Sequence, residues 1–496
     1  MTYTFATTYS ALTVATFSIL FYCLVQVVYN LYFHPLRRFP GPIHRATADL
    51  FYFLSLFSGK EVRDEHRYHT IYGPVVRVAP NTLSFTTTRA WKDIYDFKPG
   101  GNHLEKDPWF YARSMKGAGD IIQCIGKQEH ARHRKLISHA FSDAALREQE
   151  SMIKNHVDLL IQQLKRRPEV DITAWYNFAT FDIIGDLALG DSFKALEGGQ
   201  YHPWVSKIFR NVKYLSVFRL GKAYPFPIGT LLNILEPVVF RLAEQHSRCS
   251  DEKVDSRRAK QSDRKDFYSY ISRYDDDRGL SDAELKNDME IIVVAGSETT
   301  ATLLSGATYL LMKHPTMLKK LESEVRHFST DEELTFLSTS QLPYLNAIIE
   351  ESFRLYPPGP VRAPRITKPG GAMIDGHYVP GSTRVAVMPY AASRATWNFH
   401  DPEKFVPERW LKDCPTEYEL DQRSVVQPFG RGARACIGRN LAMNEIRTVL
   451  ARMIWNFELE QLPRNGVWIN QKAYTLWDKP PLWVKLTPRS PSQDMV

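Results

Sequence analysis

The sequence predicts a mainly α-helical chain with small peripheral β-sheets (α+β), preceded by a membrane-spanning helix. Three observations lead to this fold class: an uncharged apolar run opens the chain, a long apolar helical pattern occupies 281–314, and short β-branched runs stand near both ends of an otherwise helical sequence. With 496 residues, 44% hydrophobic and 24% charged, the chain can bury a large core in one large domain or several smaller ones.

The apolar run comes first. No charged side chain occurs in residues 1–33, and residues 11–28 (ALTVATFSILFYCLVQVV) are about as long as a bilayer-spanning helix. A cleaved signal peptide is the alternative, but it lacks a basic segment before the run and a small-residue cleavage site after it. Arg37 and Arg38 follow the run, where basic residues favour the cytosolic side. We therefore expect an anchor at 1–33, a proline-rich hinge at 34–44 and the main domain at 45–496.

Charge and cysteine content exclude several classes of protein. The net charge of +8 is modest for this length and forms no long Lys/Arg run, so no nucleic-acid-binding arm is indicated. The five cysteines are odd in number and scattered without CxxC spacing, so they indicate neither a disulfide framework nor a zinc knuckle and favour a reducing compartment. The polar stretch 248–277 is interpreted as a surface connection.

Strand patterns lie at the periphery. Residues 71–88 (IYGPVVRVAPNTLSFTTT) contain two β-branched runs parted by Ala-Pro-Asn, which predicts a hairpin. Further hairpins are expected at 372–389 and 467–486, and most of the sequence between the first two hairpins is helical in pattern.

The long central helix has clear ends. Ser281 and Glu284 have capping-box spacing, and the apolar pattern behind them continues until Pro315 stops it. About thirty residues at 1.5 Å each give a rod of roughly 45 Å. The pattern is apolar on nearly every side, so the helix should run through the core.

Its polar middle is out of place in a core helix. Burying Glu298 without a partner is costly, and Gly296 weakens a helix by about 1 kcal/mol relative to alanine. One interpretation is a satisfied polar cluster or a solvated kink. The other is a pocket opened at Gly296, where Glu298 and Thr299 face a group that receives protons.

A bare loop near the C-terminus holds a single cysteine, Cys436, within residues 427–438 (QPFGRGARACIG). A free cysteine is usually a small buried hydrophobe. Here, however, three nearby glycines allow a bulky planar group to approach, and the helical pattern at 440–456 would favour a thiolate at its start. Arg434 could pair with a carboxylate of the same ligand. A lone thiolate suits a metal held mainly by a macrocycle.

The pattern Phe429-x-x-Gly432-x-Arg434-x-Cys436-x-Gly438 resembles the signature of the cytochrome P450 haem-thiolate monooxygenases. Other segments resemble motifs of that family in the same order: 295–300 (AGSETT) its oxygen-activating segment, Glu351-x-x-Arg354 its ExxR helix, and 405–410 (FVPERW) its Pro-Glu-Arg segment. The resemblance spans essentially the full length. It implies the cytochrome P450 fold with a long central helix, and makes 45–496 the haem-thiolate catalytic domain.

The resemblance also implies residue roles. Cys436 would ligate the iron of haem b, in a cofactor-binding loop that includes Phe429 and Gly438. Glu298 would deliver protons and Thr299 would steady the bound oxygen. The expected partners of the haem propionates are Arg434, Arg134, Arg365 (or Arg362 in its place) and His130, which stands where the family has tryptophan.

Glu351 and Arg354 are expected to be structural. Taken alone, such an i, i+3 pair is usually an exposed bridge worth a few tenths of a kcal/mol. The resemblance implies instead that the pair meets Arg409 and helps hold the loop leading to Cys436.

Partners follow from the same resemblance. Electrons would come from a separate NADPH–cytochrome P450 reductase in the endoplasmic reticulum membrane, with cytochrome b5 as an optional second donor, and the catalytic domain would be cytosolic. The expected basic docking face comprises Arg132, Arg134, Lys135, Arg431 and Arg439. An apolar small molecule would arrive from the membrane and react with O2, contacted by 107–124, by 204–227 and by residues around Val361. Segments 29–42 and 90–100 resemble fungal family members that oxidise terpenoid or polyketide skeletons.

Two alternatives remain open at this point. A haem-thiolate isomerase or dehydratase works without O2, and such members commonly lack the acid-alcohol step that Glu298 and Thr299 provide. A membrane-anchored haem sensor would need neither a proton relay nor an electron donor.

Overall fold

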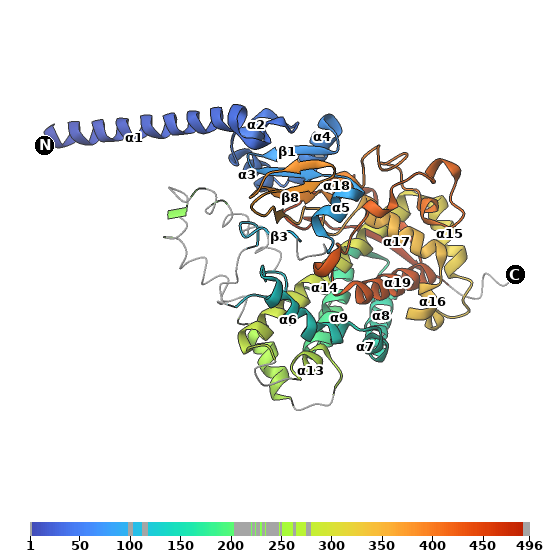
Figure 1. Cartoon of the computed structure of the whole chain (residues 1–496). Coiled ribbons are helices and arrows are strands. Elements are labelled where there is room, and N and C mark those ends of the chain that lie inside the picture. The colour runs from blue at the N-terminus through green and yellow to red at the C-terminus, as the bar shows by residue number, and fades with distance from the viewer. Residues whose placement is uncertain are drawn as a thin grey trace.

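The computed structural model describes residues 2–97, 103–111, 118–202, 250–260, 264–273 and 279–489, together with residues 220, 224, 229, 230, 234 and 248. A long N-terminal helix projects from one end, the larger β-sheet lies next to its base, and helices form the rest of the molecule (Figure 1). The predicted mainly α-helical fold with small sheets is confirmed.

The N-terminal helix α1 (Thr2–Val28) continues into a π-helical turn, η1 (Tyr29–Phe33). Two helical stretches within the described residues are long and apolar enough to cross a membrane, Thr13–Phe33 and Asp282–Lys313. The second is mostly buried and is therefore a core helix, whereas the side chains of the first are almost all exposed. Thr13–Phe33 is thus the candidate membrane span, as the apolar pattern predicts.

The hinge after this helix packs against the larger sheet. Arg77 donates its backbone N–H to Pro40 O at 2.7 Å, and its side chain reaches Asn30 O at 2.9 Å. A Cβ added to Gly41 would lie 2.3 Å from Arg77 O, so only glycine allows the hinge to lie this close to the strand.

The larger sheet has the strand order β1-β2-β8-β5-β3. The predicted hairpin at 71–88 is confirmed, since β1 and β2 pair antiparallel. Strand β8 then runs parallel to β2, and β5 joins β8 to β3 with Lys106 opposite Arg365. Its strands are β1 (Val75–Ala79), β2 (Thr82–Phe85), β3 (Glu105–Lys106), β5 (Arg365–Ile366) and β8 (Arg384–Val387).

The second predicted hairpin is confirmed in its first part. β6 (Ala372–Ile374) and β7 (His377–Val379) pair around Asp375 and Gly376, which have φ values of 51° and 79°. Positive φ at both central residues is what a tight type I′ turn requires. The last part of the predicted segment forms β8 and belongs to the larger sheet.

The C-terminal hairpin predicted within 467–486 is reduced to one isolated antiparallel bridge, between Ala473 and Trp477. β10 (Trp483–Pro488) pairs instead with β9 (Phe457–Gln461) and β4 (Glu169–Asp171). Pro480 and Pro481 lack the N–H that a strand ladder needs, so the segment directly before β10 stays irregular and approaches the long central helix, residues 282–313, as a loop.

The core is formed mainly by long helices. α14 (Asp282–Lys313) packs against α9 (Ile172–Leu189), α17 (Pro343–Leu355) and α19 (Arg439–Asn456). The predicted capping box is present, because Glu284 N donates to Ser281 Oγ at 3.3 Å and Ser281 N donates to the Glu284 carboxylate at 2.8 Å. With 32 residues, α14 is the long buried helix that the sequence predicts.

Shorter helices surround this core. They are α2 (Ile43–Thr47), α3 (Leu50–Phe57), α4 (Glu61–Tyr72), α5 (Thr88–Tyr95), α6 (Lys127–Ile137), α7 (Asp143–Glu148), α8 (Glu150–Lys165), α10 (Ala195–Gly198), α13 (Phe267–Ile271), α15 (Pro315–Val325), α16 (Phe336–Ser340) and α18 (Pro389–Ala392).

The polar stretch 248–277 is more than a surface connection. Within its described part, Arg257 Nε donates to Asp266 Oδ2 at 2.6 Å, and both side chains are buried. Asp266 also caps α13, which packs on α6 and α9. The polar composition of this stretch therefore did not predict that one of its ion pairs is buried.

Candidate active site

The Cys436 loop is closed on itself. Cys436 N donates to Phe429 O at 2.7 Å, and Gly430 and Gly432 adopt φ values of 67° and 71°, which favour glycine. A Cβ on Gly432 would lie 2.1 Å from Tyr95 O, at the end of α5. The glycines are therefore needed both for the turn and for close packing of the loop on α5.

The thiol of Cys436 is solvent-accessible, although many protein atoms surround it. Burial by these atoms raises the pKa of the thiol, while a hydrogen bond from the Gly438 backbone and the charge of Arg134 oppose that rise. A metal cation at the sulfur would reverse the shift, because a coordinating thiol is deprotonated. A Cβ on Gly438 would contact the sulfur at 3.9 Å. Glycine therefore leaves that side of the thiol without a neighbouring side chain.

Five basic side chains gather beside this loop; we call them the cation cluster: Lys106, His130, Arg134, Arg365 and Arg434. Burial and the charges of its neighbours lower the pKa of His130 to about 3. Burial, Arg434 and Arg365 lower the pKa of Lys106 to about 7. These shifts show that positive charges are held close together in a partly desolvated place.

The described acceptors of the cluster are largely backbone carbonyls. Arg434 donates to Cys124 O at 2.5 Å. Arg134 donates at 2.6 Å to the carbonyl of Ala435, the residue before Cys436. Lys106 donates to a backbone carbonyl, Ile122 O. Carbonyl oxygens do not neutralise the guanidinium charges of Arg134 and Arg434, so the cluster suits an anionic ligand with more than one carboxylate.

Two arginines, Arg365 and Arg362, are the alternatives for one propionate contact, and their positions in the structure distinguish them. Arg365 lies opposite Lys106 on β5 and over the Tyr95 ring, 5.0 Å from its centroid. Arg362, the alternative, instead forms an ion pair with Glu65. Arg365 therefore joins the cation cluster and Arg362 does not.

Lys106 is a site residue that sequence reasoning did not find. It lies in a two-residue strand whose neighbours carry no motif, and its partner Arg365 is more than 250 residues away. The pairing of β3 with β5, which short-range patterns do not reveal, brings the two together.

The residues at this site fit haem b. A single accessible thiol stands in a glycine-rich loop, and the basic side chains beside it, of which Lys106, His130 and Arg365 are buried, suit two propionates. Within the described ranges, His, Cys, Asp and Glu side chains form no group of three or more that could hold a metal ion. An iron held by Cys436 would therefore take its remaining ligands from a macrocycle and not from the protein.

The polar residues in the middle of α14 lie on two different faces of the helix. Thr299 is partly exposed and donates its hydroxyl to Ala295 O at 2.6 Å. Glu298 is buried and forms an ion pair with Lys479, from the loop before β10, with Thr302 alongside at 3.4 Å. Glu298 is thus a partnered buried acid, and Lys479 is the partner that the sequence did not reveal.

Gly296 has a packing role, and the pocket expected beside it stays a prediction. A Cβ added there would lie 3.0 Å from Ile184 on α9. Gly296 therefore lets α9 pack tightly against α14, which is a structural reason for a glycine in a buried helix.

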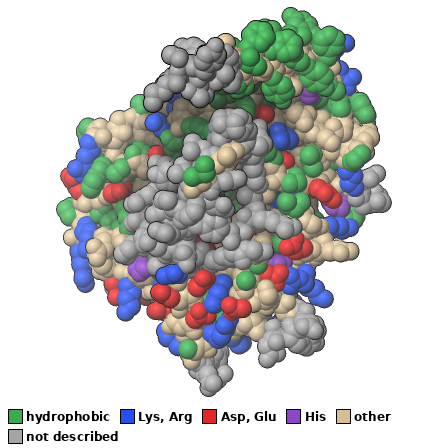
Figure 2. All heavy atoms as spheres, turned by 90° about the vertical axis from the view of Figure 1, so that its left-hand side faces the viewer, with side chains coloured by type: hydrophobic (Ala, Val, Ile, Leu, Met, Phe, Trp, Pro, Cys, Tyr) green, Lys and Arg blue, Asp and Glu red, His purple; other side chains and the backbone are tan. Residues whose placement is uncertain are grey.

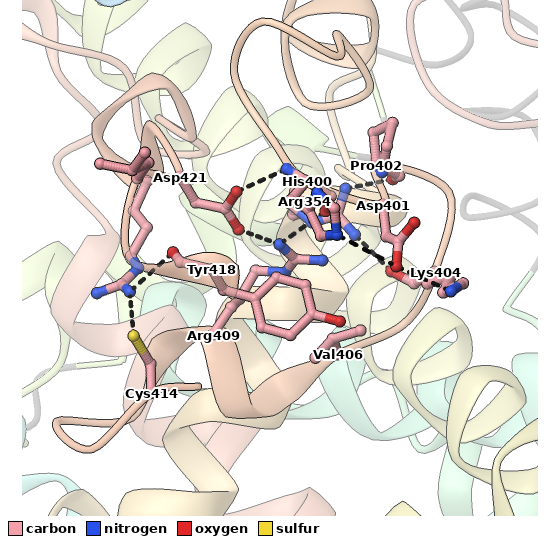
Figure 3. A network of polar contacts seen from close by, with 12 residues as sticks. Arg354, His400, Asp401, Pro402, Lys404, Val406, Arg409, Cys414, Tyr418 and Asp421 are labelled. Carbon is pink, nitrogen blue, oxygen red and sulfur yellow. Dashed lines mark hydrogen bonds and ion pairs between the residues drawn. The ribbon is translucent and has the colours of Figure 1, made fainter. Parts of the chain in front are cut away.

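Glu351, Arg354 and Arg409 form one buried network. Figure 3 shows Arg354 beside Pro402 and Lys404, and Arg409 beside Asp421. Arg354 binds Glu351 in a bidentate pair with two distances of 2.8 Å, and Arg409 Nε donates to Glu351 Oε1 at 3.2 Å. Arg409 also pairs with Asp421. The pair is not the exposed bridge of the alternative interpretation.

This network ties α17 to the loop that leads toward Cys436. Arg354 donates to three backbone carbonyls, those of Ser393 (2.8 Å), Pro402 (2.5 Å) and Lys404 (2.7 Å). Glu351 accepts the indole N–H of Trp410 at 2.8 Å. The network therefore fixes the course of a long irregular segment, 393–421.

The expected substrate segments are only partly described. Nearly all of 204–227 and the middle of 107–124 (112–117) lie outside the described residues. Near Val361, a small, partly open pocket is lined by that residue together with Phe110, Arg362, Met388 and Thr475, among others.

Comparisons with known proteins agree with this site. The family model described as Cytochrome P450 matches residues 49–485. "Cytochrome P450 monooxygenase astJ" of Aspergillus oryzae (strain ATCC 42149 / RIB 40) is 41% identical over 479 residues, covering 95% of this chain and 96% of the relative. "Averantin hydroxylase" of Dothistroma septosporum (strain NZE10 / CBS 128990) is 41% identical over 483 residues, covering 95% and 90%. "Cytochrome P450 monooxygenase astA" of Talaromyces wortmannii is 41% identical over 473 residues, covering 95% of each.

Proposed function

Because the chain belongs to the cytochrome P450 family, a family of haem-b monooxygenases, we propose that it hydroxylates or otherwise oxidises an apolar small molecule of fungal secondary metabolism with O2 and NADPH-derived electrons. The observation that carries this proposal is the accessible Cys436 thiol beside the cation cluster. The relative named averantin hydroxylase supports hydroxylation as the reaction. Resemblance to fungal members supports a terpenoid or polyketide skeleton as substrate.

Each residue of the proximal site has a proposed task. Cys436 holds the iron, and Phe429 and Gly438 shape its loop. The cation cluster binds the two propionates, so that Lys106 joins the residues expected from the sequence. Bound haem supplies oxygen activation, and the thiolate increases the electron density that favours O–O cleavage.

The distal residues handle protons. Thr299 presents its hydroxyl on the partly exposed face of α14 and would steady an oxygen species and a water there. Glu298, one residue earlier, would pass on protons from outside. Both roles favour a monooxygenase over an isomerase, a dehydratase or a sensor, none of which needs a proton supply at this place.

Glu351, Arg354 and Arg409 would act structurally. Their network is fully buried and binds backbone carbonyls of the segment before Cys436. We propose that it holds this segment in place, so that the Cys436 loop keeps its shape when the cofactor binds.

The proposed setting is the endoplasmic reticulum membrane, with the anchor at 1–33, the hinge at 34–44 and the catalytic domain at 45–496 in the cytosol. Hydrophobic side chains gather at the top of the face in Figure 2, where the N-terminal helix and the segments after it lie, including exposed Phe33, Ile43, Leu50 and Leu54. Such a patch next to a candidate span supports contact with a bilayer and entry of an apolar substrate from it.

The electron donor would be NADPH–cytochrome P450 reductase, with cytochrome b5 as an optional second donor. Of the expected basic face, Arg132 pairs with Glu284 and Arg431 pairs with Asp96 at 2.7 Å. Lys135 and Arg439 are exposed and are the best placed to attract an acidic partner.

NADPH consumption tests the proposal. Full-length protein in vesicles with a fungal reductase should consume NADPH and O2 in a haem-dependent way, and extracts of fungal metabolites should contain a compound that gains one oxygen atom. Haem binding without NADPH consumption would favour the sensor or the isomerase.

A further inference from the structure

Lys479 is an unusual residue to find beside the central helix. It precedes β10, and its ammonium group contacts Glu298 Oε1 and donates to Thr302 Oγ1 at 2.7 Å. The side chains of Lys479 and Glu298 are each only 3% exposed. A lysine buried this deeply is rare unless it is paired, so the contact with Glu298 is a specific feature of this fold.

The contact fixes the direction of the acid. Glu298 and Thr302 are four residues apart and share one face of α14, whereas Thr299 shares another face with Ala295, whose carbonyl it binds. Lys479 touches both members of the first pair. It therefore holds the Glu298 carboxylate on the face away from the Thr299 hydroxyl.

The contact also acts on ionisation. Burial raises the pKa of Glu298, and the charge of Lys479 and its hydrogen bond oppose that rise. Burial lowers the pKa of Lys479, and Glu298 opposes this shift in turn. Burial and the Glu298 charge both raise the pKa of the neighbouring Tyr356. Lys479 is the partner that favours the charged form of the acid.

The second carboxylate oxygen of Glu298 is not bound by Lys479. Glu298 Oε2 is buried and has no hydrogen-bond partner among the described residues. Buried polar atoms in proteins are almost always satisfied, commonly by an ordered water. Oε1 is thus held by Lys479, and Oε2 is the carboxylate oxygen that is left for an ordered water.

On the basis of the proposed function, we propose that Lys479 is a positioning residue for proton delivery: it holds Glu298 as a carboxylate with Oε2 free. Glu298 Oε2 takes up one proton from solvent and releases one proton to a water, and water carries that proton round α14 to the Thr299 face. The carboxylate is restored after each transfer, so no net charge accumulates. Lys479 acts through Glu298 and does not touch the reacting atoms.

Infrared spectroscopy of the resting, haem-loaded protein tests the ionisation directly. In wild type we expect no carboxylic acid C=O band from Glu298. Lys479→Met should produce such a band, and the band should be missing from the double variant Lys479→Met/Glu298→Gln. If Lys479→Met does not fold, Lys479→Gln carries the same test. Absence of the band in the single variant would overturn the proposal.

Oxygen consumption without organic substrate provides a second test. Reduction of O2 to water consumes two NADPH per O2 and needs more protons than reduction to H2O2, which consumes one. Lys479→Met should increase the H2O2 formed per NADPH severalfold and change the solvent deuterium isotope effect. In the Glu298→Gln background, the same substitution should change neither. Equal H2O2 yields in wild type and Lys479→Met would contradict the proposal.

Two controls separate the possible failures. Lys485→Met removes an exposed lysine from β10, which pairs with Glu460, and should leave H2O2 formation unchanged. The reduced-plus-CO spectrum of wild type shows whether the haem site itself is correct. A normal spectrum with no effect of Lys479→Met would refute this inference alone, whereas wild type without haem would refute the proposed function.

Discussion

Arg354 and Glu351 form a bidentate ion pair in which both side chains are completely buried, with Nε–Oε2 and Nη2–Oε1 distances of 2.8 Å. The pair is therefore not an exposed surface salt bridge. Arg409 and Trp410 also donate hydrogen bonds to the Glu351 carboxylate. A buried charge that loses its partner is strongly destabilising, which makes the pair a sensitive point of the fold.

Glu351→Gln should therefore lower the free energy of unfolding by about 3–5 kcal/mol, because it leaves Arg354 and Arg409 buried without their shared acid. Denaturant unfolding monitored by circular dichroism measures the change. The matched control is the exposed pair Arg464–Glu169, in which both side chains are 49% exposed. Arg464→Ala should cost less than about 1 kcal/mol. Equal effects of the two substitutions would show that burial does not control the strength of these pairs.

Lys106 should make the stability of the haem-free protein depend on pH. Burial, Arg434 and Arg365 lower its pKa from 10.5 to about 7. Between these values the unfolded chain binds more protons at Lys106 than the folded chain does, so the free energy of unfolding rises as the pH increases. Lys106→Met should flatten this rise in urea unfolding curves recorded between about pH 7 and pH 10.

The exposed lysine at the start of α6 is the control for this experiment: Lys127→Met should keep the wild-type profile. Haem binding brings two carboxylates to Lys106 and favours its charged form, so haem uptake near pH 8 should consume protons. Titration calorimetry in buffers of different ionisation enthalpy detects that uptake. Identical pH profiles for wild type and Lys106→Met would exclude Lys106 from the cation cluster.

Thr299→Ala should uncouple oxygen consumption from product formation. The hydroxyl of Thr299 lies on the partly exposed face of α14, and its loss removes a donor that steadies the reacting oxygen. We expect the fraction of NADPH that ends as H2O2 to rise several-fold, whereas Thr299→Ser keeps the hydroxyl and should stay close to wild type. Unchanged H2O2 formation in Thr299→Ala would remove the role assigned to this hydroxyl.

Reversal of two exposed charges should weaken the interaction with the reductase. For Lys135→Glu/Arg439→Glu we expect about a tenfold lower rate of electron transfer at low salt, with a smaller difference at high salt, because such charges mainly accelerate association. Stopped-flow reduction measures that rate, and haem content should not change. Lys60→Glu, which reverses an exposed lysine just before α4, should have no effect.

The sequence predicts the helices around the site well because their end signals are local. Ser281 and Glu284 mark the start of α14, Pro315 marks its end, and Pro343 opens α17. The Cys436 motif is also local, and the structure places Arg134 and Arg434 next to it as the resemblance implies.

What the sequence misses depends on long-range pairing. Lys106 joins the cation cluster only through the register of β3 with β5, and Lys479 reaches Glu298 only because the segment before β10 is a loop. The hairpin expected in 467–486 is reduced to one bridge because β10 pairs with β4 and β9, which lie far away in the sequence. Gly296 shows a related limit, since its purpose is the close approach of Ile184 from another helix.

The reduced-plus-CO difference spectrum of the full-length protein, compared with Cys436→Ser, tests the central claim most directly. We expect wild type to show the strongly red-shifted Soret band of thiolate-ligated haem, and Cys436→Ser to lose that band or to lose haem altogether. A wild-type protein that binds no haem, or a serine variant with an unchanged spectrum, would contradict the assignment of Cys436 as the iron ligand.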